Sequence, residues 1–257
     1  MINYSRLGTV YIFALMLCVL ACSDTKHNLY KIEAERIEIN GDLVTNTDIE
    51  TYILPYRTHI QNDLDSTLAY AKATYNKTDG ELNTAIGNLM ADLIYKEANP
   101  IFKTRTGNAI DVVLLNHGGI RAEIPKGKVS ARTAYNVMPF ENEIVVVALK
   151  GDRFKSIIDF LIRKRRAHPI SGLKIVLNKD FELVEATIDG KAITNNKIYY
   201  VATSDYLYNN GDNMSFFQPN EGFFKINYKI RNAMIDHFKK IDTIDAKADD
   251  RFITLKD

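Results

Sequence analysis

Segments with the hydrophobic patterns of strands and of helices alternate irregularly from about residue 80 to the end of the chain. The stretches AIDVVLLN, NEIVVVALKG and KIYYVATS are short and either apolar or alternating, as buried strands are. Between them, stretches such as DRFKSIIDFLIRKRR repeat apolar residues at helical spacing. This mixture predicts a single α/β domain of the mixed α+β type, in which helices flank a mixed sheet.

The clearest predicted helix lies in TDGELNTAIGNLMADLIYKEANP. Thr78 and Glu81 have the spacing of a capping box, and Pro100 is expected to end the helix. Weaker patterns predict an opening strand over residues 30–40 and a late helix in NYKIRNAMIDHFKKI.

The first residues have the pattern of an export signal. The apolar stretch from Val10 to Ala21 is shorter than the roughly 20 residues that a membrane-spanning helix needs. It ends in VLAC, which resembles a bacterial lipobox. We therefore expect residues 1–21 to be a lipoprotein signal peptide and Cys22 to be lipidated. Ordinary signal cleavage nearby and an uncleaved anchor are the alternatives.

The expected domain organisation follows from this leader. Residues 22–29 are a polar tether, and residues 30–257 form the folded domain. A lipid on the N-terminus attaches a protein to a membrane without crossing it. The predicted product is thus an exported lipoprotein anchored in the bacterial cell envelope, on its periplasmic or surface face.

The charges of the chain nearly cancel, with 33 basic and 32 acidic residues. Without an overall positive field, a nucleic-acid polymer is not an expected partner. Hydrophobic residues make up 46% of the chain, which is enough for a folded core.

The stretch LLNHGGIRAEIPKGKVS, residues 114–130, places glycines and polar residues directly after an apolar strand. The ends of strands are common ligand sites in α/β sheets. Gly118 and Gly119 allow backbone amides to approach a ligand closely, Asn116 can donate and accept, and Arg121 offers a charged fork for phosphate or carboxylate. From the residues alone, the stretch is either a polar-ligand loop or a structural turn with a surface arginine.

A second polar loop, ATSDYLYNNGDNMSFF, follows another predicted strand. Its aromatic rings are candidate platforms for stacking a base, and Asp212 and nearby amides can bond sugar hydroxyls. Tyr206 and Tyr208 can equally be hydrophobic anchors beneath a polar turn. Phe140, which follows a proline in MPFENE, is a third aromatic candidate, and core packing is its alternative role.

The sequence contains no recognisable catalytic motif. Asn116-His117 matches a pair found in calcineurin-like metallophosphatases, but no acidic residue follows the histidine, and the five histidines are scattered. Gly-x-Ser-x-Gly, a catalytic cysteine and a P-loop are not present either. We therefore predict neither a metal site nor a catalytic residue in this chain.

Four stretches occur together in an order and spacing that resemble the C-terminal domain of the 5′-nucleotidase family. They are IGNLMADLIY, LLNHGGIRAEIPKGKVS, VMPFENEIVVVALKGD and YYVATSDYLYNNGDNMSFF, within about residues 70–240. Each is weak alone, and their joint occurrence is specific. In that family an N-terminal metallophosphatase domain holds two metals and performs hydrolysis. The C-terminal domain grips the nucleotide and rotates to deliver its phosphate.

The resemblance implies a role for each matching position. Asn116 and Arg121 match the substrate-facing residues of the family's Asn-x-Gly-Gly-Ile-Arg loop. Phe140 and Tyr206 match the two aromatics that sandwich the base, with Tyr206 in place of a usual phenylalanine. Asp212 matches the acid that bonds the ribose hydroxyls. Four loop-shaping neighbours complete the predicted substrate-binding set: Gly118, Gly119, Asn209 and Gly211.

Two positions depart from the family pattern. The family usually has an Arg-Glu-Thr-Asn run, and the missing arginine, a phosphate contact, is Leu82 here. Reduced phosphate affinity is therefore expected. The family's Gly-Gly-Asp is Asn210-Gly211-Asp212 here, so Asn210 must adopt a turn conformation that favours glycine.

The segment between Cys22 and the matched region has only about 50 residues, too few for a metallophosphatase domain. The resemblance then implies the substrate-binding half of a split 5′-nucleotidase, which binds a nucleotide or nucleoside and is not catalytic alone. A separate metallophosphatase chain would supply the divalent metals, and the pair would act in nucleotide catabolism. The alternatives are a non-catalytic nucleoside-binding lipoprotein and a scaffold with a vestigial site.

The basic run Arg163-Lys164-Arg165-Arg166 falls in the last turn of its predicted helix. Cations at this position complement the helix dipole and stay solvated. The alternative is that the run steers anionic nucleotides or lipid headgroups, and the sequence leaves both possibilities open.

Overall fold

The computed structural model describes residues 11, 16 and 29–255. Its contacts divide the chain into two units, Met1–Glu50 and Thr51–Asp257, and the predicted domain bounds of 30–257 stay a prediction. The predicted signal peptide, Cys22 and all of the tether except Leu29 lie outside the described residues. None of the described helices is long and apolar enough to cross a membrane.

Residues 29–40 form neither helix nor strand, so the opening strand predicted over residues 30–40 is wrong. The side chains of Ile32, Ile37 and Ile39 are all highly exposed. A strand is stabilised by a partner strand and by a core on one of its faces. No described strand pairs with this segment, and its apolar side chains are not packed in either hydrophobic core.

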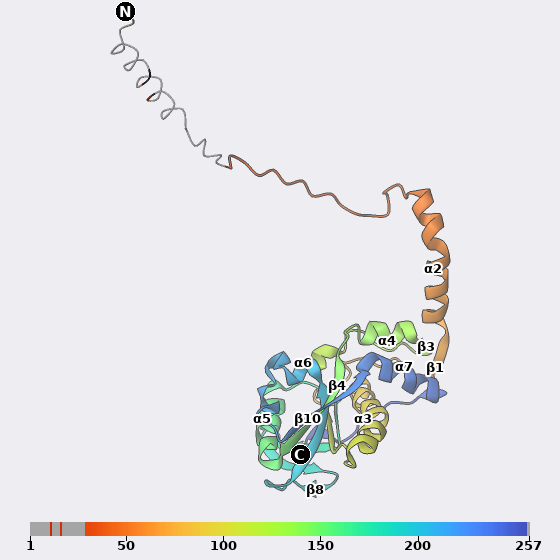
Figure 1. Cartoon of the computed structure of the whole chain (residues 1–257). Helices are drawn as coiled ribbons and strands as arrows, with labels where there is room; N and C mark the ends of the chain where they lie inside the picture. The colour runs from red at the N-terminus through yellow and green to blue at the C-terminus, as the bar shows by residue number, and fades with distance from the viewer. Residues whose placement is uncertain (1–10, 12–15, 17–28, 256–257) are drawn as a thin grey trace, which may run out of the picture. The chain divides into compact units, whose positions relative to one another are not determined.

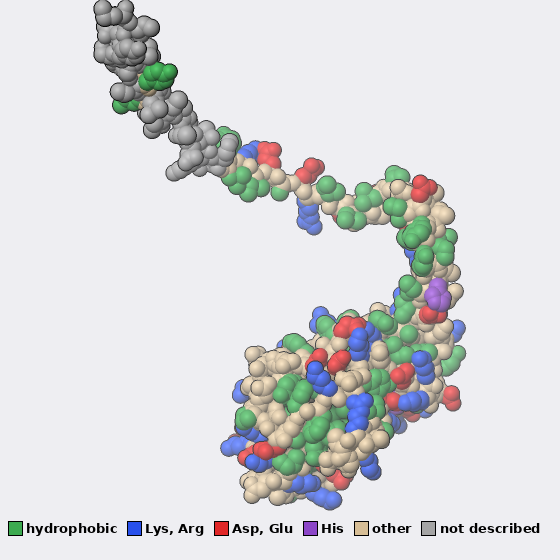
Figure 2. Space-filling model, viewed as in Figure 1, with side chains coloured by type: hydrophobic (Ala, Val, Ile, Leu, Met, Phe, Trp, Pro, Cys, Tyr) green, Lys and Arg blue, Asp and Glu red, His purple; other side chains and the backbone are tan. Residues whose placement is uncertain are grey.

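Helix α2, Thr47–Asp65, continues through Pro55, and none of its residues is buried. Large apolar side chains such as Tyr52 stay exposed, and Figure 2 shows hydrophobic side chains on the visible face of this helix. At its C-terminal end, Asp65 accepts two hydrogen bonds from the guanidinium of Arg132.

Five strands form the central sheet, in the order β10-β4-β9-β2-β5. The strands are β2 (Val112–Leu114), β4 (Glu143–Lys150), β5 (Ile170–Ser171), β9 (Ile198–Ser204) and β10 (Gly222–Lys229). β2 and β9 run parallel, and the other neighbouring pairs are antiparallel. Because side chains alternate between the faces of a strand, the sheet feeds two cores: Val113 and Val146 pack into one, Val112 and Val147 into the other.

Two smaller sheets flank this arrangement. One has the order β11-β1-β3 and the other β12-β6-β7-β8. Their strands are β1 (Thr67–Ala71), β3 (Gly127–Ser130), β6 (Leu173–Leu177), β7 (Leu183–Ile188), β8 (Lys191–Ala192), β11 (Thr243–Ile244) and β12 (Phe252–Thr254). The predicted mixed α+β class is confirmed, and the strands are distributed over three mixed sheets instead of one.

Helices cover both faces of the central sheet (Figure 1). α3 (Ala85–Thr106) and α7 (Ile230–Lys240) pack together on one face, where they join the first core. α5 (Phe154–Lys164) covers the other face and joins the second core. Two short helices, α4 (Ala131–Val137) and α6 (Asp205–Tyr208), lie at the ends of strands β3 and β9.

The predicted boundaries of the longest core helix are wrong at both ends. Thr84, not Thr78, is the N-cap of α3, and its hydroxyl accepts from the backbone N–H of Gly87. The helix also continues past Pro100 to an end at Gly107, which has the left-handed conformation. Pro100 lies on the exposed face of the helix, whereas Phe102, half a turn further on, is buried in the core. Core packing therefore stabilises the helix beyond Pro100, although the proline cannot donate a backbone hydrogen bond.

The late helix begins at Ile230, three residues after its predicted start at Asn227. Residues 222–229 are instead the strand β10, which the sequence analysis missed. β10 lies at the edge of the central sheet and pairs only with β4, so much of it stays exposed. An edge strand with exposed aromatic and charged residues lacks the apolar run that identified β2 and β9.

Candidate functional site

Three loops meet at one edge of the central sheet because of how its strands are paired. β2 and β9 are parallel, so their C-terminal ends, at Leu114 and Ser204, lie at the same edge. β4 is antiparallel to β9, with Ile144 opposite Ser204, so the start of β4 lies at this edge too. The residues after β2 and β9 and those before β4 are therefore brought together.

The loop after β2 is a short 3-10 turn at His117–Gly119. The N–H of Gly119 donates to the carbonyl of Asn116 at 3.0 Å, and the N–H of Arg121 donates to the carbonyl of Val137 at 2.8 Å. A Cβ at Gly119 would lie 2.7 Å from Asn116 Oδ1. Glycine at this position therefore lets the Asn116 amide fold back over its own loop.

The loop after β9 begins with helix α6, whose N-cap Ser204 accepts from the N–H of Leu207. Beyond the helix, Asn210 has the left-handed conformation, with φ of 68°, as expected from its replacement of a family glycine. A Cβ at Gly211 would lie 2.4 Å from the ring of Tyr206. Glycine at position 211 therefore leaves room for the tyrosine ring.

The segment before β4 carries Phe140 and is held by helix α7. Arg231 is 4% exposed, and its guanidinium donates to the carbonyl of Phe140 at 3.2 Å. It also pairs with Glu141, which bonds Lys229 as well. Hydrogen bonds from Lys229 and Arg231 lower the pKa of Glu141 to about 2. The backbone of Phe140 is therefore held in place by the side chain of Arg231.

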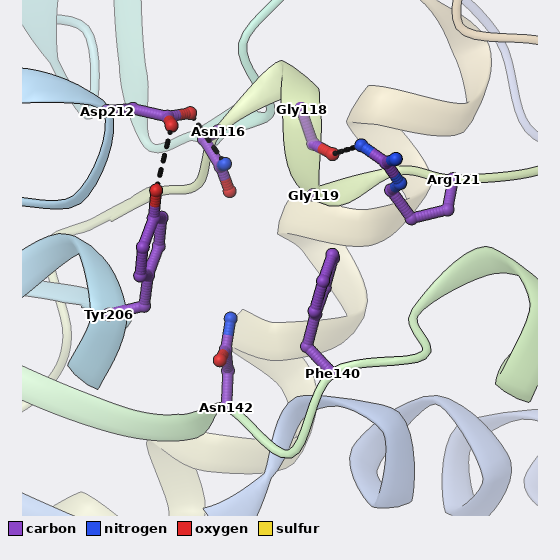
Figure 3. A pocket seen from close by; sticks show the side chains of 8 residues that line it. All are labelled: Asn116, Gly118, Gly119, Arg121, Phe140, Asn142, Tyr206 and Asp212. Carbon is purple, nitrogen blue, oxygen red and sulfur yellow. Dashed lines mark hydrogen bonds between the residues drawn. The ribbon is translucent and has the colours of Figure 1, made fainter. Parts of the chain in front are cut away.

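The three loops enclose one cavity of about 260 Å³ (Figure 3). This volume is near the lower limit of typical small-molecule pockets, about 300 Å³. The rings of Phe140 and Tyr206 lie on opposite sides of the cavity, and Asn142 lies between the backbone ends of these two side chains. Eight residues line it: Asn116, Gly118, Gly119, Arg121, Phe140, Asn142, Tyr206 and Asp212.

Asp212 is the centre of the polar contacts in this pocket. Asn116 Nδ2 donates to Asp212 Oδ2 at 2.7 Å, and the Tyr206 hydroxyl donates to Asp212 Oδ1 at 3.1 Å (Figure 3). On the other side, Arg121 Nη1 donates to the carbonyl of Gly118 at 3.3 Å, and its guanidinium lies 5.9 Å from the centre of the Phe140 ring. The pocket thus presents two rings, one carboxylate, two amides and one guanidinium.

Seven of the nine predicted site residues line this pocket. Phe140 is 40% exposed and Tyr206 46% exposed, so neither is a core residue. Asn209 and Gly211 do not line the cavity. Gly211 lies against the Tyr206 ring, and the Asn209 amide donates to the carbonyl of Asp205. Tyr208 stacks on another ring instead, at 4.2 Å from Phe223. Of the two tyrosines in the loop, one lines the pocket and the other is an anchor.

Asn142 lines the pocket and was missed from the sequence. Its backbone carbonyl accepts from the N–H of Ile230, which fixes this segment further. No signal in the sequence marks this position, because an asparagine is equally common in a turn that faces solvent.

Leu82, which replaces the family arginine, is a core residue. It is 5% exposed and belongs to the cluster that contains Leu114 and Ile170. Its side chain supplies no charge to the pocket.

In the part of the chain that the structure describes, the side chains do not fit a metal ion. Among the described residues, no group of three or more His, Cys, Asp and Glu side chains lies close enough together to hold an ion. The backbone N–H of His117 donates to His168 Nδ1, which occupies the lone pair that would bind a metal there.

A family model described as 5′-nucleotidase, C-terminal domain, matches residues 58–219. Protein 5NUC of Lutzomyia longipalpis is 25% identical over 223 residues, which cover 76% of this chain and 39% of that protein. Protein UshA of Escherichia coli (strain K12) is 26% identical over 147 residues, which cover 55% of this chain and 26% of UshA.

A solved structure gives the same result for the fold. The crystal structure of a 5′-nucleotidase precursor from Thermus thermophilus matches with a TM-score of 0.67 at 21% identity, over 81% of this chain and 43% of that one. This chain therefore spans less than half the length of these relatives. Since the family model matches more than half of its residues, the chain belongs to the 5′-nucleotidase C-terminal domain family.

Proposed function

We propose that this chain is the substrate-binding half of a split 5′-nucleotidase-type phosphohydrolase. It binds the nucleoside part of a nucleotide, and a separate metallophosphatase chain with its own divalent metals performs hydrolysis in nucleotide catabolism. The observation that carries the proposal is that Asn116, Phe140, Tyr206 and Asp212 line one cavity in a chain of this family.

The two rings are the binding site for a base in this proposal. Phe140 and Tyr206 face the cavity from opposite sides, and each is partly exposed, so a flat ligand can insert between them. Stacking on an aromatic side chain contributes about 1–3 kcal/mol per base. Neither ring is held only by the ligand, because Arg231 bonds the backbone of Phe140 and the Tyr206 hydroxyl donates to Asp212.

Asp212 is the binding site for the sugar. An ionised carboxylate is an acceptor only, and its two oxygens offer about four lone-pair sites. Asn116 and Tyr206 use one hydrogen bond on each oxygen, so acceptor capacity remains for vicinal hydroxyls. The same two donors fix the orientation of the carboxylate before a ligand arrives.

Arg121 is the residue that faces the phosphate in this proposal. Its single side-chain hydrogen bond within the described residues is the long one to the Gly118 carbonyl, and the residue is exposed. A guanidinium in this state can turn toward a phosphate with little loss of other contacts.

We further propose that the protein is an exported lipoprotein, attached to the cell envelope through Cys22. The sequence pattern of its first residues supports this location. Mass spectrometry of the protein from membranes tests it, because acylation at Cys22 is expected, and an unmodified Cys22 in the mature protein would contradict the location.

A phosphate-release assay tests the function. Adenosine 5′-phosphate is incubated with this chain, with a metallophosphatase chain from the same organism plus divalent metal, and with both together. We expect release to rise strongly only in the mixture and to fall again when Phe140→Ala replaces the native chain. Equal release with and without this chain would contradict the split enzyme.

A non-catalytic nucleoside-binding lipoprotein is the second candidate, and the burial of Leu82 favours it. Without the arginine that this position carries in the family, the chain lacks one phosphate contact. Calorimetry separates the two candidates. The second predicts that adenosine binds at least as tightly as adenosine 5′-phosphate, whereas the split enzyme predicts tighter binding of the phosphate ester.

A further inference from the structure

We call the cavity between Phe140 and Tyr206 the nucleoside pocket, after its proposed ligand. A second cavity, of about 450 Å³, adjoins it and is strongly basic. The two cavities share Gly118 and Asp212 in their walls. Five basic or imidazole side chains line the second one, which we call the basic pocket: His117, Arg163, Lys164, Arg166 and His168.

The four basic residues at the end of helix α5, residues 163–166, do not all point the same way. Three of them line the basic pocket, and one packs elsewhere. Arg163 and Lys164 lie 6.0 and 5.5 Å from the centre of the Phe160 ring, which also lines the basic pocket. Arg165 is the C-cap, with φ of 47°, and its guanidinium stacks over Phe181 at 3.9 Å, away from the pocket. The chain reversal then returns Arg166 to the pocket. Three of the four cations are thereby gathered on one side.

The positive charge of the basic pocket is not neutralised within the part of the chain that the structure describes. None of Arg163, Lys164 and Arg166 forms an ion pair there. Asp212 is the one carboxylate in the wall, and its two oxygens accept from Asn116 and Tyr206 on the other side. A helix end with unpaired solvated cations is common, so this charge alone does not identify a ligand.

His168 supplies the independent observation. It is 7% exposed, and its Nδ1 accepts from the backbone N–H of His117 at 3.3 Å. The neutral ring then carries its hydrogen on Nε2, and this buried atom has no acceptor in good hydrogen-bond geometry among the described residues. The backbone of Leu115 lies near the ring and offsets only part of the effect of burial on its pKa. Burial lowers the pKa of His168 to about 4, so the ring is neutral at pH 7. A buried donor without a well-placed acceptor thus lies in the wall of a cationic cavity.

We propose that the basic pocket is a phosphate-binding site, separate from the nucleoside pocket. A phosphate presents several acceptor oxygens in different directions, and it can bond guanidinium, ammonium and imidazole donors at once. His168 Nε2–H then gains its acceptor, and the cations gain their counter-charge. The site uses residues from α5, from the turn after it and from the loop after β2.

The phosphate has two possible sources, and the chemistry is the same for both. It can be free inorganic phosphate, or it can be esterified to the sugar of the ligand in the nucleoside pocket. The second source rests on the proposed function. Because Asp212 and Gly118 belong to both walls, a group on the sugar edge that Asp212 bonds lies beside the basic pocket.

Inorganic phosphate provides the first test. The whole chain is titrated with phosphate at pH 7.5 and constant ionic strength, with chloride as reference, and the imidazole ¹⁵N signals are recorded. We expect saturable shifts of His168 with phosphate and none with chloride. Lys164→Gln and Arg166→Gln, both at exposed positions, are each expected to lower the affinity about three- to tenfold. Lys155→Gln, which removes a charge from the same helix outside the pocket, should leave it unchanged.

Phosphate shifts that equal those with chloride would overturn the proposal, as would an equal loss of affinity in Lys155→Gln. Adenosine 3′-phosphate, adenosine 5′-phosphate and adenosine then distinguish the sources by calorimetry. Tighter binding of the 3′-phosphate than of adenosine, lost in Arg166→Gln, identifies a phosphate on the sugar. Phe140→Ala separates the two proposals, because it should lower adenosine affinity roughly tenfold or more and leave inorganic phosphate binding intact.

Discussion

The nucleoside pocket and the basic pocket share part of one wall and differ in almost every other property. The first is walled by two partly exposed rings, and its charged groups are one carboxylate and one guanidinium. The second is walled by three cations and two imidazoles. Asp212 stands between them, with both oxygens bonded from the nucleoside side. A flat, neutral group and an anion can therefore be recognised side by side without competing for the same side chains.

Replacing the shared carboxylate should produce the largest effect and move the two pockets in opposite directions. Asp212→Asn keeps the shape and tolerates the φ of 51° at this position, but it removes the charge. Hydrogen bonds to charged groups contribute about 1.5–3 kcal/mol, so we expect adenosine affinity to fall roughly 10- to 100-fold. Phosphate affinity at the basic pocket should stay equal or rise. Calorimetry with both ligands measures this.

The control for that change is Asp180→Asn, which removes an exposed carboxylate from the turn between β6 and β7. It should alter neither affinity. If Asp212→Asn lowered phosphate and adenosine binding together, the two cavities would act as one site and the comparison would fail.

Removing a ring should affect the nucleoside pocket alone. Phe140→Ala deletes one wall, and the loss of stacking of about 1–3 kcal/mol predicts a fall in adenosine affinity of roughly tenfold or more. Phe140→Tyr keeps the ring and should bind nearly as the native chain does. Because Phe140 is 40% exposed, the unfolding temperature of either variant should change little. A large drop in stability would mean that the ring is a structural element after all.

The basic pocket differs from its neighbour in holding a buried imidazole, and this predicts a pH dependence of stability. The folded pKa of His168, about 4, is below the value of about 6.5 in an unfolded chain. Between these values the unfolded state binds more protons, so the stability present above pH 6.5 is lost as the pH falls toward 4. The loss between pH 7.5 and pH 5 should be about 2 kcal/mol.

Urea unfolding at both pH values, compared with His168→Phe, measures this contribution. The phenylalanine variant does not titrate, so its stability should fall by about 2 kcal/mol less than that of the native chain over the same range. His59→Asn, at an exposed position of α2, should behave as the native chain does. Parallel pH profiles for the native chain and His168→Phe would show that the imidazole is not held neutral.

Most of the nucleoside pocket could be predicted from the sequence because its residues lie in three short segments next to recognisable strands. Asn116, Gly118, Gly119 and Arg121 directly follow an apolar run, and strand pairing alone brings such ends to one edge. The resemblance to a known family then joined Phe140 and the second loop to them. Asn142 was missed, because nothing in MPFENE distinguishes a pocket amide from a polar residue in a turn.

The basic pocket could be predicted only in part. The run at residues 163–166 is visible in the sequence, but its local pattern fits a solvated helix end equally well. What separates the alternatives is His168, whose ring meets the loop after β2 through a contact 51 residues apart in the chain. Burial of that kind depends on tertiary packing. The same reason explains the errors at Thr78 and Pro100, where the local signals for a helix start and a helix end were not followed.

The smallest expected effect concerns the choice of base. The Asn142 amide lies between the backbone ends of the Phe140 and Tyr206 side chains (Figure 3). There it can donate to or accept from the edge of a nucleobase stacked between the two rings. A neutral hydrogen bond contributes about 0.5–1.5 kcal/mol, so Asn142→Ala should weaken the preferred nucleoside roughly two- to tenfold. Adenosine and inosine differ in donor and acceptor at one edge, and the difference between their affinities should shrink in this variant. Phosphate binding should not change, since Asn142 does not line the basic pocket. An unaltered adenosine-to-inosine ratio would mean that the rings bind any flat ligand and that Asn142 has no part in selecting it.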